Sequence, residues 1–372
     1  MNNGRSLQME GTMARFVLRA LVLTALLGLA AAPALAGSEG RKGTAGALEL
    51  RIPVGARGTA LGGAVASDIS GVEAMFWNPA GLANVTGTDA MFSHQNYFAD
   101  MKLNYAGVAS KVGDFGVLGL SVKVLSIGDI YVTTEQAPEG TGEILTPTFA
   151  VLGGSWARQF TDRVNFGGTV SYVSENIASN TANGVAFDFG VQYMTDWHGF
   201  RLGMVIKNYG TSMSYSGPGF EVSVLDPNQD PNAGPHKLTY DGTSFEMPSY
   251  ISLSSSYNIV QSSRARLTAL AAFQNNNFSG DNLRGGLEWN YRDMFALRGS
   301  YFGSFNGTID PATGEETFAF DGGDDLYEGW ALGAGLGTKF GAASTVGVDF
   351  AYRPVKDGLF DDTYELGVHL KF

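Results

Sequence analysis

The side chains of this sequence limit the chemistry that it could perform. It has no cysteine, so disulfides, thiolate metal sites and thiol nucleophiles are excluded. Its histidines are scattered, and neither a His-Glu-x-x-His nor a Gly-x-Ser-x-Gly motif occurs. We therefore expect a protein that is not an enzyme and that needs no cofactor. The four histidines are His94, His198, His236 and His369.

Two acidic stretches resemble part of a calcium-binding loop. Residues 226–232 (DPNQDPN) place oxygen-bearing side chains at alternate positions, as the start of such a loop does. However, Pro231 stands where an EF-hand needs glycine, and Lys237 stands where it needs glutamate. Residues 321–325 offer no better pattern. We expect solvated, turn-rich loops and no metal site.

A distinctive motif without catalytic groups lies in the first quarter of the chain. Asn-Pro favours a turn, and the residue before a proline avoids helical angles. The motif follows residues 57–69, which are rich in alanine and glycine and predict a short helix. Both belong to residues 44–86, which show no strand-like alternation. The motif consists of Trp77, Asn78, Pro79, Ala80, Gly81 and Leu82.

The final strand of the chain has one apolar and one polar face. Successive side chains of a strand point to opposite faces, so alternate residues share one face. Such a strand, ending on an aromatic residue, is typical of a transmembrane β-barrel. We expect it to face outer-membrane lipid and to be the segment that the barrel-assembly machinery recognises. Its apolar face consists of Tyr364, Leu366, Val368, Leu370 and Phe372.

The start of the chain predicts export. Arg15 and Arg19 precede an apolar run, and residues 34–36 (ALA) fit a signal-peptide cleavage site. We expect residues 1–36 to be a cleaved signal peptide. No later stretch is long and apolar enough for a transmembrane helix. The protein is then periplasmic, secreted or an integral barrel of the bacterial outer membrane.

Composition favours the barrel among these three. Charged residues make up 16% of the chain, against about 25% in ordinary soluble domains. Aromatic residues reach 12%, and 51 residues are glycine. Residues 1–36 carry a net +2, so the formal charge of −12 becomes about −14 without them. An acidic chain disfavours nucleic acid as a partner, because phosphate binding needs a basic surface.

The remaining sequence predicts an all-β fold, a transmembrane antiparallel barrel of about 14 strands. Alternating segments recur through residues 88–372, separated by linkers that are alternately short and long. Short periplasmic turns and long outer loops are typical of bacterial barrels, whereas a soluble β-sandwich has no reason to sort loop lengths in this way. The expected strands are residues 88–97, 102–112, 116–126, 148–160, 164–175, 184–195, 199–208, 248–258, 264–273, 282–291, 294–304, 327–340, 344–353 and 362–372.

We then expect residues 37–87 to form a plug inside the barrel. The Trp77–Leu82 motif would gate or seat this plug, or would simply form a turn packed on the barrel wall. A periplasmic extension is the alternative for the whole segment. Glycines on the inner face of the strand near residue 333 would leave room for close packing of a plug.

The plug segment also carries a family resemblance. Residues 50–57 (LRIPVGAR), 62–64 (GGA) and 77–83 (WNPAGLA) resemble the PorV/PorQ family of outer-membrane proteins. That family is similar to FadL-type transporters of hydrophobic substrates, which share an Asn-Pro-Ala motif in an N-terminal hatch. The resemblance covers the whole chain after residue 36 and implies a plugged barrel of fourteen strands.

The resemblance implies a function as well. PorV-like proteins serve type IX protein secretion, in which they bind the C-terminal domains of secreted cargo and deliver them to the attachment complex. A cargo-binding shuttle is therefore our first expectation. A FadL-like channel for long-chain fatty acids or other hydrophobic small molecules is the alternative. A structural barrel within a larger outer-membrane complex is a third.

Overall fold

The computed structural model describes residues 41–195, 197–224, 235–309, 316–321, 328–340, 344–356 and 360–372. The expected signal peptide and residues 226–232 lie outside this part of the chain. Within it, no helix has the length and apolar character needed to cross a membrane.

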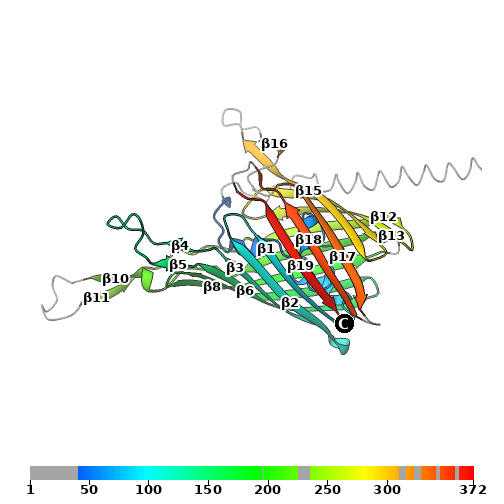
Figure 1. Cartoon of the computed structure of the whole chain (residues 1–372), viewed down its shortest axis with the longest axis horizontal. Helices are drawn as coiled ribbons and strands as arrows, with labels where there is room; N and C mark the ends of the chain where they lie inside the picture. Colours follow the sequence, from blue (N-terminus) through cyan, green and yellow to red (C-terminus); the bar gives the residue numbers. More distant parts are fainter. Residues whose placement is uncertain are drawn as a thin grey trace, which may run out of the picture. The chain divides into compact units, whose positions relative to one another are not determined.

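Fourteen antiparallel strands form a closed ring (Figure 1). Each strand pairs with the next in sequence, and the first pairs with the last, from Asp89↔Lys371 to Asn96↔Tyr364. This confirms the expected class and strand number. The ring consists of β1 (Thr88–Asn96), β2 (Lys102–Val112), β3 (Gly116–Ser126), β6 (Thr148–Thr161), β7 (Val164–Ile177), β8 (Asn180–Met194), β9 (Arg201–Gly210), β12 (Tyr250–Gln261), β13 (Ala265–Asn276), β14 (Asp281–Tyr291), β15 (Phe295–Ile309), β17 (Gly329–Phe340), β18 (Ser344–Arg353) and β19 (Thr363–Lys371).

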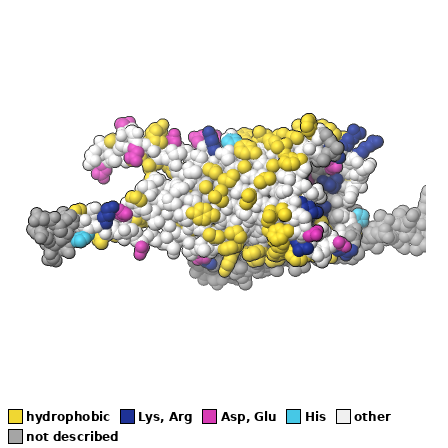
Figure 2. All heavy atoms as spheres, turned by 90° about the horizontal axis from the view of Figure 1, so that it is seen from below, with side chains coloured by type: hydrophobic (Ala, Val, Ile, Leu, Met, Phe, Trp, Pro, Cys, Tyr) yellow, Lys and Arg dark blue, Asp and Glu magenta, His cyan; other side chains and the backbone are white. Residues whose placement is uncertain are grey.

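The outer face of the ring is apolar. Figure 2 shows hydrophobic side chains gathered over the barrel wall. Aromatic clusters lie near the short turns, where Trp156 packs edge-on against Phe160, and near the opposite end, where Trp330 packs against Tyr352. Inward positions instead carry polar residues, such as Ser254 and Glu288. This division matches a wall with lipid outside and a polar interior.

The two ends of the ring differ in their connections. Short turns join strands at one end, for example η4 (Gly113–Phe115). The other end carries long loops with three small additions: the hairpins β4 (Ile130–Tyr131) with β5 (Ile144–Leu145) and β10 (Glu221–Val224) with β11 (His236–Thr239), and β16 (Glu316–Asp321), which pairs with β15.

One expected long connection is absent. We expected a loop of eight residues, 176–183, between two strands on the long-loop side. Instead β7 and β8 continue to Ile177 and Asn180 and meet in a tight turn, where Ala178 has a φ of 53°. The alternation in the sequence weakens at residues 176–183 because small and polar residues dominate this extension.

Residues 41–87 lie within the ring and supply more than half of its largest buried apolar cluster. The segment contains η2 (Leu48–Arg51), α2 (Ala56–Ala60), α3 (Ala74–Trp77) and η3 (Pro79–Asn84). Its α2 packs on β15, β17, β18 and β19, whereas η3 packs on β3, β6, β7 and β8. The segment therefore bridges two opposite arcs of the wall. The helix expected over residues 57–69 is only five residues long, because Gly62 and Gly63 take left-handed φ angles of 62° and 77°.

Candidate functional site: two cavities separated by the plug

Two cavities lie on either side of residues 41–87, which we call the plug. The mouth cavity, of about 600 Å³, opens at the long-loop end, between the plug and the links β1–β2 and β13–β14. The lower cavity, of about 400 Å³, opens at the short-turn end. A volume of this order suits a small organic ligand.

The mouth cavity combines aromatic surface with positive charge. Phe302 lines it, with the guanidinium groups of Arg284 and Arg353 at 5.1 and 5.4 Å from its ring centroid. No aspartate or glutamate is among the described lining residues, although Ser304 of the lining donates a hydrogen bond to the buried Glu328 behind it. The aromatic lining residues are Phe76, Trp77, Tyr97, Phe98, Tyr250, Phe278 and Phe302, and the cations are Lys42, Arg51, Arg284 and Arg353.

The lower cavity is lined by paired charges. Glu288 of β14 accepts from Arg57 of the plug at 2.7 and 2.9 Å and from Arg298 of β15 at 2.8 Å. Arg298 continues the chain of ion pairs to Asp349 of β18, whose other oxygen lies 2.9 Å from His369 of β19. The buried charges are thereby compensated, as burial requires, and the plug is tied to the wall.

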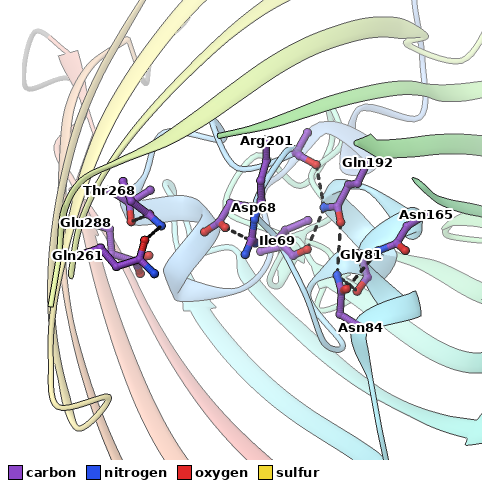
Figure 3. Close-up of polar contacts among 12 residues, drawn as sticks. Asp68, Ile69, Gly81, Asn84, Asn165, Gln192, Arg201, Gln261, Thr268 and Glu288 are labelled. Atoms are coloured by element: carbon purple, nitrogen blue, oxygen red, sulfur yellow. Dashed lines mark hydrogen bonds and ion pairs between the residues drawn. The ribbon is translucent and has the colours of Figure 1, made fainter. Parts of the chain in front are cut away.

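On the opposite arc, neutral hydrogen bonds join the plug to the wall (Figure 3). Gln192 of β8 donates to the backbone oxygens of Ala66 and Ile69 at 3.0 and 2.9 Å. Asn165 of β7 donates to Asn84 of the plug at 3.1 Å. Asp68 adds one ion pair there, to Arg201 of β9 at 2.6 Å.

The Trp77–Leu82 motif lies at the centre of this arrangement and is almost completely buried. Asn78 caps η3 by accepting from the amide of Ala80, and its amide group donates to the oxygens of Ala66 and of Val191 in β8. Trp77 donates to the oxygen of Val54 at 2.9 Å and lines the mouth cavity. The motif thus braces the plug internally, packs on several wall strands and hydrogen-bonds to one of them, β8. Whether it also gates the interior stays a prediction.

Pro79, Ala80, Gly81 and Leu82 complete the motif in a confined space. Pro79 occupies the first turn of η3, where a proline lacks no hydrogen bond. A Cβ atom on Gly81 would lie 2.2 Å from the oxygen of Ile69, so only glycine fits. Ala80 and Leu82 are fully buried.

The apolar face of the terminal strand points outward. Leu366 is 51% exposed and Phe372 is 61% exposed, with Tyr364 and Leu370 also exposed and Val368 half-buried. The opposite face holds Glu365 against the plug. This orientation suits lipid contact, and recognition by the assembly machinery stays a prediction.

The site residues that we expected from the sequence do not include the charged residues that join the plug to the wall. His94, His198 and His236 lie on three other elements, in the β1 strand, the β8–β9 turn and β11, while His369 alone among the four lies by the lower cavity. The inward position of Glu288 was visible in the alternation of β14. Its partners were not, because Arg57, Arg298 and Asp349 are distant in sequence.

Strand register decides whether three apolar residues, Phe302, Met204 and Ile206, face lipid or the interior. Phe302 is buried and lines the mouth cavity. Met204 is 41% exposed on the outer face, and Ile206 shares that face two positions away. The alternation of a strand that carries glycines on one side does not reveal which face points to lipid, because a shift of one residue in the strand register exchanges the two faces.

One carboxyl group of the plug is strongly perturbed. Burial, and then repulsion from the nearby carboxylate of Glu175, raise the pKa of Glu49 to about 8. Burial likewise raises the pKa of Glu73. Glu49 therefore favours the protonated form at neutral pH.

Comparison with known proteins places the fold. The CymD monoaromatic hydrocarbon channel aligns with a TM-score of 0.53 and 14% identity, over 86% of this chain and 97% of that chain. A toluene transporter of P. putida, TodX, aligns with a TM-score of 0.51 and 13% identity, over 86% and 98%. No protein-family model matches the sequence, and no curated protein matches it.

The chain therefore has the fold of these proteins, a closed barrel of 14 antiparallel strands. Identities of 13 and 14% show the fold alone. The similar proteins are transport channels by description. The expected relation to the PorV/PorQ family finds no support in these comparisons.

Proposed function

We propose that this protein is a channel of the bacterial outer membrane that admits hydrophobic small molecules. The mouth cavity carries the proposal, since it offers about 600 Å³ bordered by seven aromatic side chains at the long-loop end. Its four cations suit a molecule with an apolar body and an anionic head, such as a long-chain fatty acid. The similarity to hydrocarbon channels supports the same class of substrate.

The test is ligand binding by the purified full chain in detergent. We expect palmitic acid to bind, and Phe302→Ala to weaken binding about tenfold because it removes a buried ring between two guanidinium groups. Arg353→Gln should weaken binding of palmitic acid more than binding of toluene, which has no charge. Leu253→Ala, on the outer face of β12, is the matched control and should bind as the native chain does.

Failure of this test has a clear form. If neither palmitic acid nor toluene binds the native chain, or if both bind Phe302→Ala as tightly as the native chain, the mouth cavity is not the binding site. Mass spectrometry of lipids extracted from the protein purified out of its own outer membrane gives an independent check.

A specific observation favours the cargo-binding function as a second candidate. The loop of residues 127–147 projects from the barrel and holds acidic residues but no lysine or arginine (Figure 2). On the small hairpin within it, Tyr131 is 70% exposed, and Ile130 and Ile144 are also exposed. Exposed apolar groups on a projecting loop suit protein contact.

The second candidate is tested with a purified secreted protein that carries a type IX C-terminal β-domain. Binding that is lost in the double variant Tyr131→Asp and Ile144→Asp would support a shuttle that presents cargo to an attachment complex. Equal binding by native and variant chains would contradict it.

A further inference from the structure

The two cavities are separated by a thin partition along β14 and β15. On β14, Asn282 and Arg284 line the mouth cavity, whereas Glu288 and Asn290 line the lower cavity. Only the inward position of Gly286 lies between them. Four residues of strand span about 14 Å, so a single layer of side chains closes the passage here.

The same order appears on the neighbouring strand. On β15, Phe302 lines the mouth cavity and Arg298 the lower one, with Ser300 between them. The wall itself is continuous at this level, because β14 and β15 pair without interruption from Asp281↔Phe305 to Tyr291↔Phe295. The closure between the cavities is therefore made by the plug and not by a fold of the wall.

The plug element that fills this layer is α2 with the two glycines that follow it. Ser300 donates to the oxygen of Ala60 at 2.9 Å, and Arg284 donates to the oxygen of Gly62 at 2.8 Å. Small residues face each other across the contact. A Cβ atom on Gly333 of β17 would lie 2.4 Å from the Cβ of Ala60.

Glycines with left-handed backbone angles flank α2 on both sides and could act as hinges. Gly55 precedes the helix with a φ of 85°, and Gly62 and Gly63 follow it with φ of 62° and 77°. Such angles are open to glycine at no steric cost. A five-residue helix between such glycines can swing as a unit while its neighbours stay in place.

The contacts that hold α2 can be replaced by contacts with water or with the wall. Arg57 and Thr59 are held by the carboxylates of Glu288 and Glu365, the latter at 2.6 Å from Thr59 Oγ1. Glu288 keeps its second partner, Arg298, if Arg57 leaves. Arg57 already lines the polar lower cavity, where Asp68 of the plug, at 2.8 Å, is a further partner.

We infer that molecules pass from the mouth cavity to the lower cavity between α2 and the β14–β15 wall, when α2 swings away on its glycine hinges. This inference rests on the proposed function. The η3 side of the plug stays seated on β6–β8 throughout. The passage is thus a local opening and does not require expulsion of the plug.

Reversible cross-linking tests this route, and the absence of native cysteine makes it specific. Ala60 and Ala351 of β18 belong to one buried cluster with Ala56. In the double variant Ala60→Cys and Ala351→Cys, a short bifunctional methanethiosulfonate reagent would lock α2 to the wall. The matched control joins η3 to β7 through Asn84→Cys and Asn165→Cys.

The readouts are uptake of radiolabelled palmitic acid by cells without another such channel, and binding of palmitic acid to the purified chain. We expect the α2 lock to reduce uptake about tenfold, with recovery after reduction, and to leave binding unchanged. The η3 lock should leave both unchanged. The reduced form of each variant shows that it has folded.

Other outcomes overturn the inference in distinct ways. Undiminished uptake with α2 locked would show that the route avoids α2. Equal loss with either lock would show that the plug moves as a whole. If the native chain neither binds nor takes up palmitic acid, the proposed function itself fails. As a converse test, Arg57→Gln should raise uptake at least twofold, and an unchanged or lower rate would contradict the role of α2.

Discussion

The two sides of the plug are attached to the wall by different chemistry. On the β7–β8 side, amide groups of Asn78 and Gln192 bond to backbone oxygens, in positions that only one geometry satisfies. On the β14–β19 side, Arg57 donates to the carboxylate of Glu288 beside the lower cavity, and the amide of Gly55 donates to the buried carboxylate of Glu365 (Figure 3 shows Glu288 on this side). One side therefore resembles a protein core, whereas the other resembles an interface.

This difference suggests a division of labour. Neutral hydrogen bonds between buried groups are costly to leave unmade, because no water reaches them when the plug shifts. Ion pairs beside a cavity can exchange partners with water. A plug fixed on one side and releasable on the other can open without unfolding.

The largest expected effect comes from Glu288→Gln. The change leaves Arg57 and Arg298 together without the carboxylate between them, and removing one partner of a buried pair costs about 3–5 kcal/mol. We expect the α2 side to open, with faster hydrogen exchange at residues 56–63 and a higher ion conductance in planar bilayers. If exchange at residues 56–63 is unchanged, the releasable side is not held by these ion pairs.

Asn78→Ala should have the next largest effect, on the opposite side. The variant loses the cap of η3 and the bonds to Ala66 and Val191, a cost of about 2–4 kcal/mol. Exchange should accelerate at residues 78–85 while residues 56–63 stay protected. Equal acceleration in both segments would mean that the two sides are not independent.

The carboxyl group of Glu49 makes the plug sensitive to pH. Its pKa is about 8 in the folded protein and near 4.5 in the unfolded chain, so the folded state binds the extra proton between these values. Stability of the plug should fall as pH rises through that window, by at most about 1.4 kcal/mol per pH unit, and level off above it.

Hydrogen exchange at residues 47–52, corrected for its intrinsic pH dependence, measures this effect. Glu49→Gln stays neutral at every pH and should abolish the slope. A slope that persists in Glu49→Gln would assign the dependence to another group, such as Glu73.

The smallest expected effect is that of Asn84→Ala, at the edge of the β7–β8 side. Asn84 has one bond of 3.1 Å to Asn165 and two longer ones, and its side chain is exposed. Water can replace these partners, so we expect about 0.5–1 kcal/mol. Comparison with Asn78→Ala in the same exchange experiment would measure how steeply the attachment weakens toward the edge. A cost equal to that of Asn78→Ala would argue against such a gradient.

Much of the wall could be predicted from the sequence, for a local reason. Alternation with a period of two identifies a strand and its lipid-facing side without knowledge of its partners. Gly333 is a case in which composition also indicated a contact between wall and plug. The space that we expected beside this inner-face glycine is occupied by Ala60. The prediction was less good at residues 176–183, where small and polar residues dominate and the alternation is lost.

The site depended on information that no local pattern contains. Asn78 was conspicuous because of Pro79, but its bond to Val191 joins residues 113 positions apart. The lower cavity brings together Arg57, Glu288 and Asp349 from the plug and two distant strands. Such pairings follow from closure of the ring and from the register of each strand.

By itself, then, the sequence determined a fourteen-stranded wall with an apolar outside, because strand alternation is a property of neighbouring residues. The tertiary structure decided how the plug divides the interior into two cavities and which of its sides is held by charge. Closing the ring sets the depth of every inward side chain along the barrel axis, and this depth decides which cavity the side chain lines. Depth is what places Phe302 at the mouth and Glu288 below α2.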